Sequence, residues 1–177
     1  MKVLKILGFV MLAFVGMARA ENLTVYFTQS GNTERLATAI YERVDGDIVR
    51  INPVVPYPDS YEETVEVAKR EQEENARPAY EKTGVDVADY DTVFLGFPNW
   101  WGGMPMIMYT FLENNDFSGK TIVPFVTYGS SGVGNSIEEI KRMAPGATVV
   151  DAFSMRGVET LQDYSEKVDI WLKKIGK

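Results

Sequence analysis

The sequence contains no cysteine and no histidine. Disulfides, thiol nucleophiles, thiolate-ligated metal clusters and imidazole acid–base chemistry are therefore excluded. Any chemistry must come from carboxylates, lysine, tyrosine, hydroxyl groups or a bound cofactor. A formal net charge of −7 argues against nucleic acid as a partner, because binding its backbone needs clustered cations.

The sequence also lacks an apolar run long enough for a membrane-spanning helix. Lys2 and Lys5 precede an apolar run at residues 6–17, shorter than the roughly 20 residues that a span needs. Ala18-Arg19-Ala20 fits the small-residue pattern of a cleavage site, so residues 1–20 are expected to be a secretory signal peptide. The protein is then exported, periplasmic or extracellular, after cleavage near Ala20, with an uncleaved anchor as the alternative. Residues 21–177 are expected to form one globular domain with no stable membrane insertion.

The stretch LTVYFTQSGNT at residues 23–33 predicts a strand, a tight turn and the start of a helix. Residues 23–28 favour a strand, and Leu36, Ile40 and Val44 then follow at helical spacing. Unpaired N–H groups and the helix dipole at such a turn favour an anion. No Lys or Arg lies between residues 23 and 34, so hydroxyls and amides would hold it, which suits a phosphate monoester. An ordinary capped turn is the alternative interpretation.

The rest of the chain alternates strand and helix patterns. Further strands are predicted at residues 47–52, 92–97, 121–127 and 148–153. Helices are predicted from Ser60 to about residue 76, from Pro105 to about 115, from Ser136 to about 143, and in a last segment capped by Thr160. Ser60 with Glu63 and Ser136 with Glu139 form capping-box patterns at two of these starts. This alternation predicts an α/β fold with a doubly wound, five-stranded parallel sheet. Pro124 breaks the usual rule for a central strand, and the sequence offers no reason for it.

Three loops follow predicted strand ends, at residues 28–33, 98–103 and 127–134. Strand ends of a parallel sheet point the same way, so these loops can converge on one crevice. The second loop carries adjacent tryptophans, either of which offers a flat face to a planar ring, followed by Gly102 and Gly103. Taken singly, the tryptophan pair also fits core packing, and the glycines also fit turns.

These blocks resemble flavodoxins. TQSGNT at residues 28–33 matches the flavodoxin phosphate loop, commonly written T/S-x-T/S-G-N-T. PNWWGGMP at 98–105 resembles the ring-binding loop of a bacterial flavodoxin-like subgroup, and residues 111–137 are similar to its next strand and loop. The resemblance covers essentially residues 22–177. It implies strand order 2-1-3-4-5, one noncovalent FMN and electron transport by a flavoprotein.

The resemblance also assigns roles within the three loops. Thr28, Ser30, Asn32 and Thr33 would bind the phosphate with the amide of Gly31. Trp100 or Trp101 would stack on the isoalloxazine ring, while Gly102 would permit a peptide change near reduced N5. Tyr128, Gly129 and Ser130 would flank the pyrimidine edge. The full expected cofactor-binding set is Thr28, Gln29, Ser30, Gly31, Asn32, Thr33, Pro98, Asn99, Trp100, Trp101, Gly102, Thr127, Tyr128, Gly129, Ser130 and Gly132. No catalytic residue and no metal ligand is expected.

An electron carrier of this kind would act on unidentified redox partner proteins, as a monomer or weak dimer. The expected export differs from the usual cytoplasmic setting of electron-transfer flavodoxins. The alternatives are an FMN-dependent NAD(P)H reductase of quinones or nitro compounds and a binding protein without cofactor. Residues 127–134 also resemble the TGxxxGxG loop of short-chain dehydrogenases. We reject that interpretation for two reasons. The dehydrogenase loop follows the first strand of its fold, whereas here too little chain remains after residue 134. The Tyr-x-x-x-Lys pair of those enzymes is also missing, because Val168 stands four residues after Tyr164.

Overall fold

The computed structural model describes residues 22–177, and the predicted signal peptide lies outside these residues. Five parallel strand positions form one sheet, in the order β2-β1-β3-β4-β5. The first four strands are β1 (Asn22–Tyr26), β2 (Asp47–Arg50), β3 (Thr92–Pro98) and β4 (Thr121–Tyr128). The predicted fold class and strand order are confirmed.

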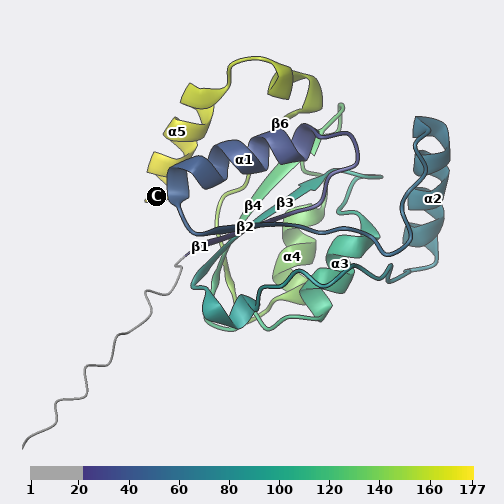
Figure 1. The fold of residues 1–177 in the computed structure, drawn as a ribbon, viewed down its shortest axis with the longest axis horizontal. Coiled ribbons are helices and arrows are strands. Elements are labelled where there is room, and N and C mark those ends of the chain that lie inside the picture. Colours follow the sequence, from purple (N-terminus) through teal and green to yellow (C-terminus); the bar gives the residue numbers. More distant parts are fainter. Residues whose placement is uncertain (1–21) are drawn as a thin grey trace, which may run out of the picture.

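Helices cover both faces of the sheet (Figure 1). On one face, α1 (Asn32–Val44) and α5 (Ser165–Lys174) pack against a cluster that contains Phe94 and Phe125. On the other, α3 (Met106–Glu113) and α4 (Ser136–Met143) pack against a cluster that contains Leu95 and Phe97. Successive residues of β3 thus enter opposite cores, as expected for a strand buried on both faces.

The fifth strand position differs from the prediction. Two short strands, β5 (Thr148–Val149) and β6 (Phe153–Arg156), both pair with β4 and replace the continuous strand expected at 148–153. The interruption lies opposite Pro124. The amide of Val150 donates to Ile122, so the next donor from β4 along this ladder would be residue 124, whose proline nitrogen carries no hydrogen. The missing donor explains both the break and the place of this proline in a central strand.

Two of the predicted helix caps are wrong, although the bounds predicted for the helix from Ser136 to about 143 are confirmed. Thr160 caps no α-helix: it lies in the 3₁₀ helix η2 (Gly157–Leu161), and α5 begins five residues later. Ser136 is the first residue of α4 instead of its cap, and its hydroxyl is buried without a hydrogen-bond partner in the part of the chain described. Ser60, by contrast, caps α2 (Tyr61–Glu73) as predicted, with its hydroxyl accepting from the amide of Glu63 at 3.2 Å.

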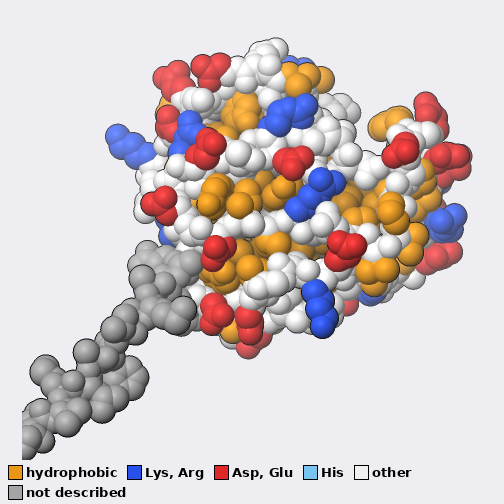
Figure 2. All heavy atoms as spheres, viewed as in Figure 1, with side chains coloured by type: hydrophobic (Ala, Val, Ile, Leu, Met, Phe, Trp, Pro, Cys, Tyr) orange, Lys and Arg blue, Asp and Glu red, His pale blue; other side chains and the backbone are white. Residues whose placement is uncertain are grey.

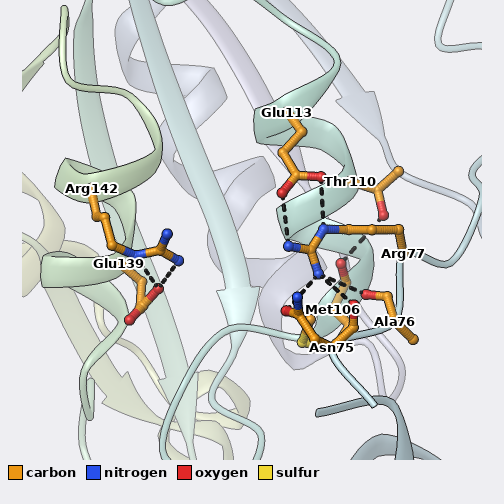
Figure 3. A network of polar contacts seen from close by, with 8 residues as sticks. All are labelled: Asn75, Ala76, Arg77, Met106, Thr110, Glu113, Glu139 and Arg142. Carbon is orange, nitrogen blue, oxygen red and sulfur yellow. Dashed lines mark hydrogen bonds and ion pairs between the residues drawn. The ribbon is translucent and has the colours of Figure 1, made fainter. Parts of the chain in front are cut away.

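Helix α2 stands beside the sheet instead of lying flat on it (Figure 1). Its C-terminal end is fixed by the connector that follows, where Arg77 forms two 2.7 Å hydrogen bonds to the Glu113 carboxylate on α3 (Figure 3). The same guanidinium bonds the carbonyl of Asn75 and lies over the ring of Tyr109. The N-terminal end of α2 is thereby left at the carboxyl edge of the sheet. A second 3₁₀ turn, η1 (Val87–Asp89), completes the connector to β3.

Candidate functional site

The first loop joins β1 to α1 at the carboxyl edge of the sheet. Gly31 is the N-cap of α1 with φ of +80°, and as a glycine it supplies no side-chain cap, so the first-turn N–H groups face the loop. The hydroxyl of Thr28 accepts from the amide of Gly31 at 3.0 Å, and the hydroxyls of Thr33 and Thr127 lie 2.8 Å apart. Both threonines are buried: the Thr28 hydroxyl closes the loop, and the Thr33 hydroxyl joins the start of α1 to β4.

The second loop folds back on itself directly after β3. Trp100 and Gly103 exchange backbone hydrogen bonds of 2.9 and 3.1 Å. The Trp100 ring is half-buried and meets Phe27 and Tyr57 edge-on, with ring centroids 5.3 and 5.0 Å apart. These contacts fix the plane of the Trp100 ring.

Trp101 has a different environment. It is 50% exposed and has φ of +52°, a left-handed conformation that is uncommon for a non-glycine residue. Its indole N–H donates to the carbonyl of Val65 on α2 at 3.0 Å, and the Lys69 ammonium lies over its ring. The two tryptophans are thus divided between the sheet edge and α2.

Asn99 joins the second loop to the third. Its side-chain NH₂ donates to the carbonyl of Gly132 at 2.7 Å, and its side-chain oxygen accepts from the amide of Gly102 at 3.0 Å. The amide of Asn135 donates to the carbonyl of Gly102 at 2.9 Å. The loops also touch closely, since a Cβ on Gly134 would lie 1.9 Å from the Gly102 carbonyl oxygen.

The three loops enclose one side of a cavity of about 690 Å³, within the range of small-molecule sites. Figure 2 shows a hollow between α2 and the rest of the molecule. The residues of the expected set that line the cavity are Gln29, Ser30, Asn32, Pro98, Asn99, Trp100, Trp101, Gly102, Thr127, Tyr128, Gly129 and Ser130. The other expected residues, Thr28, Gly31, Thr33 and Gly132, belong to the same loops but do not line it.

The sequence of the chain places it in a known family. A family profile described as Flavodoxin matches residues 21–175. The chain belongs to the flavodoxin family. Among solved structures, it is similar to a flavoprotein from Bacteroides uniformis, at 33% identity and a TM-score of 0.76 over 87% of this chain and 98% of that one. A flavoprotein from Bacteroides eggerthii matches at 30% identity and a TM-score of 0.77, over 89% and 99% of the two chains.

A more distant structure shares the fold. It is a flavoprotein from Lactobacillus acidophilus in complex with FMN, at 19% identity and a TM-score of 0.65, over 86% of this chain and 98% of that one. No curated protein matches the chain.

A second wall of this flavodoxin's cavity was not predicted from the sequence. Residues from the start of α2, together with Gly157 and Val158 of η2 and Ser131, complete the lining; those before and within α2 are Asp59, Tyr61, Thr64, Val65 and Ala68. A signal for α2 was present, because the connection after β2 must also begin at the carboxyl edge of a parallel sheet. No sequence signal pointed to η2.

The η2 segment lies beside the first loop through Asn32. The hydroxyl of Thr160 donates to the side-chain oxygen of Asn32 at 3.3 Å. A Cβ on Gly157 would lie 2.5 Å from the Asn32 side-chain nitrogen, so glycine is required for this approach. Asn32 therefore contacts η2, the segment that directly follows β6.

The cavity lining of this flavodoxin consists mainly of aromatic rings and uncharged polar groups. Trp100, Trp101, Tyr128 and Tyr61 supply rings, and the remaining polar groups are mainly hydroxyls and amides. Asp59 is its one carboxylate, and none of the lining residues, all within the described range, is Lys or Arg. Within residues 22–177 there is also no cluster of three acidic side chains able to hold a metal ion, and no helix is long and apolar enough to span a membrane.

Behind the cavity, the phenol of Tyr57 donates a 2.8 Å hydrogen bond to the Glu71 carboxylate on α2. Burial, followed by the nearby Glu71 charge, raises the pKa of the Tyr57 phenol well above its usual range. Burial also raises the pKa of Glu71, although the bond from Tyr57 opposes this. Because Tyr57 packs on Trp100, the pair connects α2 to the fixed aromatic wall.

Proposed function

We propose that this protein binds one FMN noncovalently in the cavity and carries electrons between redox partners. The observation that carries the proposal is the meeting, in one cavity, of a hydroxyl-rich strand-to-helix turn and a tryptophan-bearing loop. Membership of the flavodoxin family and the FMN complex of the Lactobacillus acidophilus flavoprotein support it. FMN, when bound, supplies reversible redox chemistry that the chain's own side chains lack.

The residues fit the two ends of such a ligand. At the phosphate end, Ser30, Asn32 and the first-turn amides of α1 offer neutral donors beside the helix dipole. At the ring end, Trp100 offers an aromatic wall whose plane is fixed by Phe27 and Tyr57. Asn99 holds the loops on which both Trp100 and Gly129 lie, so binding requires little rearrangement of this wall.

Flavin binding to the purified protein tests the proposal. FMN added to flavin-free protein should lose fluorescence at a saturable ratio of one to one. Trp100→Ala should weaken FMN by roughly tenfold, because the aromatic wall is lost, and Trp101→Ala by less than about threefold. Trp171→Phe is the control, because Trp171 belongs to α5, packs against Phe94 and Phe153, and does not line the cavity. Protein that neither holds nor takes up FMN would refute the proposal.

The alternative within the same family is a reductase that takes hydride from NAD(P)H. One observation favours it: Tyr61 and Val158 line the cavity yet are 78% and 64% exposed, which leaves its mouth open to a second reactant. Rapid NAD(P)H oxidation by FMN-loaded protein with a quinone would select the reductase. Electron exchange with a redox protein, without NAD(P)H oxidation, would select the carrier.

The proposal for the site of action rests on the sequence of residues 1–20. We propose that the protein works outside the cytoplasm, as a monomer or weak dimer, with redox partner proteins of that compartment. The charged n-region, the short apolar run and the Ala-Arg-Ala pattern support export. Mass spectrometry of protein recovered from the producing cell tests this, since a mature N-terminus at Glu21 is expected.

A further inference from the structure

An arginine that lines no part of the cavity lies against its phosphate-binding turn. Arg35 stands in the first turn of α1, and its guanidinium nitrogen Nη1 lies 3.3 Å from where a Cβ on Gly31 would be. The same nitrogen donates to the side-chain oxygen of Asn32 at 3.4 Å. The guanidinium thus folds back over the turn instead of extending into solvent.

Arg35 lines a second hollow that adjoins the cavity. This hollow runs along α1 and is lined by Ser30, Gly31 and Arg35, among others, and Ser30 also lines the cavity. Within residues 22–177, Arg35 has no ion-pair partner, whereas Arg43 on the same helix pairs with Asp169 of α5. The positive charge beside the turn is therefore not neutralised by a carboxylate in contact with it.

The charges around the turn make this arginine consequential for an anion. Glu34 is its neighbour in the first turn of α1, and Asp59 lies in the cavity lining. A phosphate monoester carries a charge of about −1.5 to −2 near pH 7, while the helix N-terminus offers only about +0.5. Arg50 helps from the other side, where its guanidinium donates to the carbonyl of Thr28 at 3.3 Å. Arg35 adds a full positive charge on the side open to solvent.

We propose that Arg35 increases the preference of this site for phosphorylated flavin over unphosphorylated flavin. The inference rests on the proposed function and assigns a specificity role to a residue outside the expected binding set. Arg35 acts through charge and by holding the Asn32 side chain, so its effect falls on the phosphate end and not on the ring.

The test compares affinities for FMN and riboflavin, which differ only in the phosphate. In low salt, Arg35→Gln should weaken FMN by about two- to fivefold and leave riboflavin unchanged, as expected for a partly exposed charge pair. Arg35→Lys should retain most of the preference because it keeps the charge. Arg43→Gln is the matched control, since it removes one positive charge from the same helix away from the turn.

Salt provides a second readout. The difference between wild type and Arg35→Gln should shrink to near onefold at about 0.5 M salt, where screening is strong. An unchanged FMN-to-riboflavin ratio in Arg35→Gln, or equal weakening of both ligands, would overturn the inference and leave the proposed function intact. Wild-type protein that binds neither flavin would overturn the proposed function, and this inference with it.

Discussion

The cavity has two walls that are held in different ways. The wall at the sheet edge comes from residues 98–103 and 127–134, which Asn99 and the Asn135–Gly102 bond join into one unit. The opposite wall is the start of α2, where only Thr64 and Ala68 of the helix are buried and Tyr61 is 78% exposed. Segments with little buried surface open more readily than the core, so the first wall is preformed and the second is adjustable.

The difference assigns separate tasks to the two walls. The sheet-edge wall holds Trp100 in a fixed plane, which suits recognition of a rigid ring. The α2 wall is attached through a few side chains, such as the Trp101 indole bonded to Val65 and the Gln29 side chain bonded to the carbonyl of Pro58. The C-terminal end of α2 is followed by the two bonds of Arg77 to Glu113, whereas its N-terminal end is held by single side-chain bonds, so the N-terminal end is the more easily displaced.

The largest effect is expected from breaking the junction between the two sheet-edge loops. Gly134→Ala should destabilise the fold by about 2 kcal/mol or more, because its φ is +57° and its new Cβ would meet the Gly102 carbonyl oxygen. Gly129→Ala is the control, since no atom lies within 4 Å of its Cβ position, and its effect should stay within about 0.5 kcal/mol. Chemical denaturation measures both. Equal stability of the two variants would mean that the two loops can move apart at Gly134 and Gly102 without loss of stability.

A smaller effect is expected from removing the Asn99 side chain. Asn99→Ala leaves the Gly102 amide and the Gly132 carbonyl without their partner. This should lower the free energy of unfolding by about 1–3 kcal/mol and also weaken the binding of FMN. Asn99→Asp should fall between, because it keeps an acceptor for Gly102 but places a carboxylate oxygen against the Gly132 carbonyl.

The control for Asn99 is Asn115→Ala. Asn115 also bonds one carbonyl, that of Phe111, but it lies at the end of α3 and does not line the cavity. The Asn115→Ala variant should be somewhat less stable than wild type and should bind FMN with unchanged affinity. If Asn99→Ala retains full FMN affinity, the rigid wall is not needed for binding.

The sheet-edge wall could be predicted from the sequence, because its signals are local. Apolar runs at 92–97 and 121–127 identify strands buried on both faces, and parallel strands must deliver their following loops to one edge. The family and the fold followed from the same residues. The local pattern could not show that the hydroxyls of Thr28 and Thr33 bond within the protein, since the partner of Thr33 is Thr127 on β4, far away in sequence.

The errors arise where tertiary contacts override local preference. Ser136 and Glu139 form a capping pattern, but the amide of Asn135 bonds the Gly102 carbonyl, Asn135 becomes the N-cap, and the helix starts one residue earlier than a Ser136 cap requires. The fifth strand breaks because of Pro124 on a neighbouring strand, which no reading of 148–153 alone could reveal. The α2 wall was missed because its cavity residues lie on a helix whose sequence is dominated by exposed charge.

The smallest effect concerns the bond that ties α2 to the aromatic wall. Burial raises the pKa of Glu71 above its ordinary value of 4.5. A raised pKa in the folded state means that the associated stability is complete below the unfolded pKa and is lost as pH rises through the folded value. Glu71→Gln stays neutral and still offers Tyr57 an acceptor, so its stability relative to wild type should increase from about pH 4 and then level off at higher pH.

Tyr57→Phe provides the opposite test: Glu71→Gln removes the titration of this carboxyl, whereas Tyr57→Phe should make the effect of that titration on stability larger. The phenol bond lowers the pKa of Glu71, so its removal should raise that pKa further and steepen the loss of stability with rising pH. Unfolding free energies of wild type and both variants between about pH 4 and 8 provide the measurement. If the difference in unfolding free energy between wild type and Glu71→Gln is the same at every pH in this range, ionisation of Glu71 does not destabilise the fold. The bond between Tyr57 and Glu71 would then hold the α2 wall to the sheet-edge wall equally well at neutral and at acidic pH.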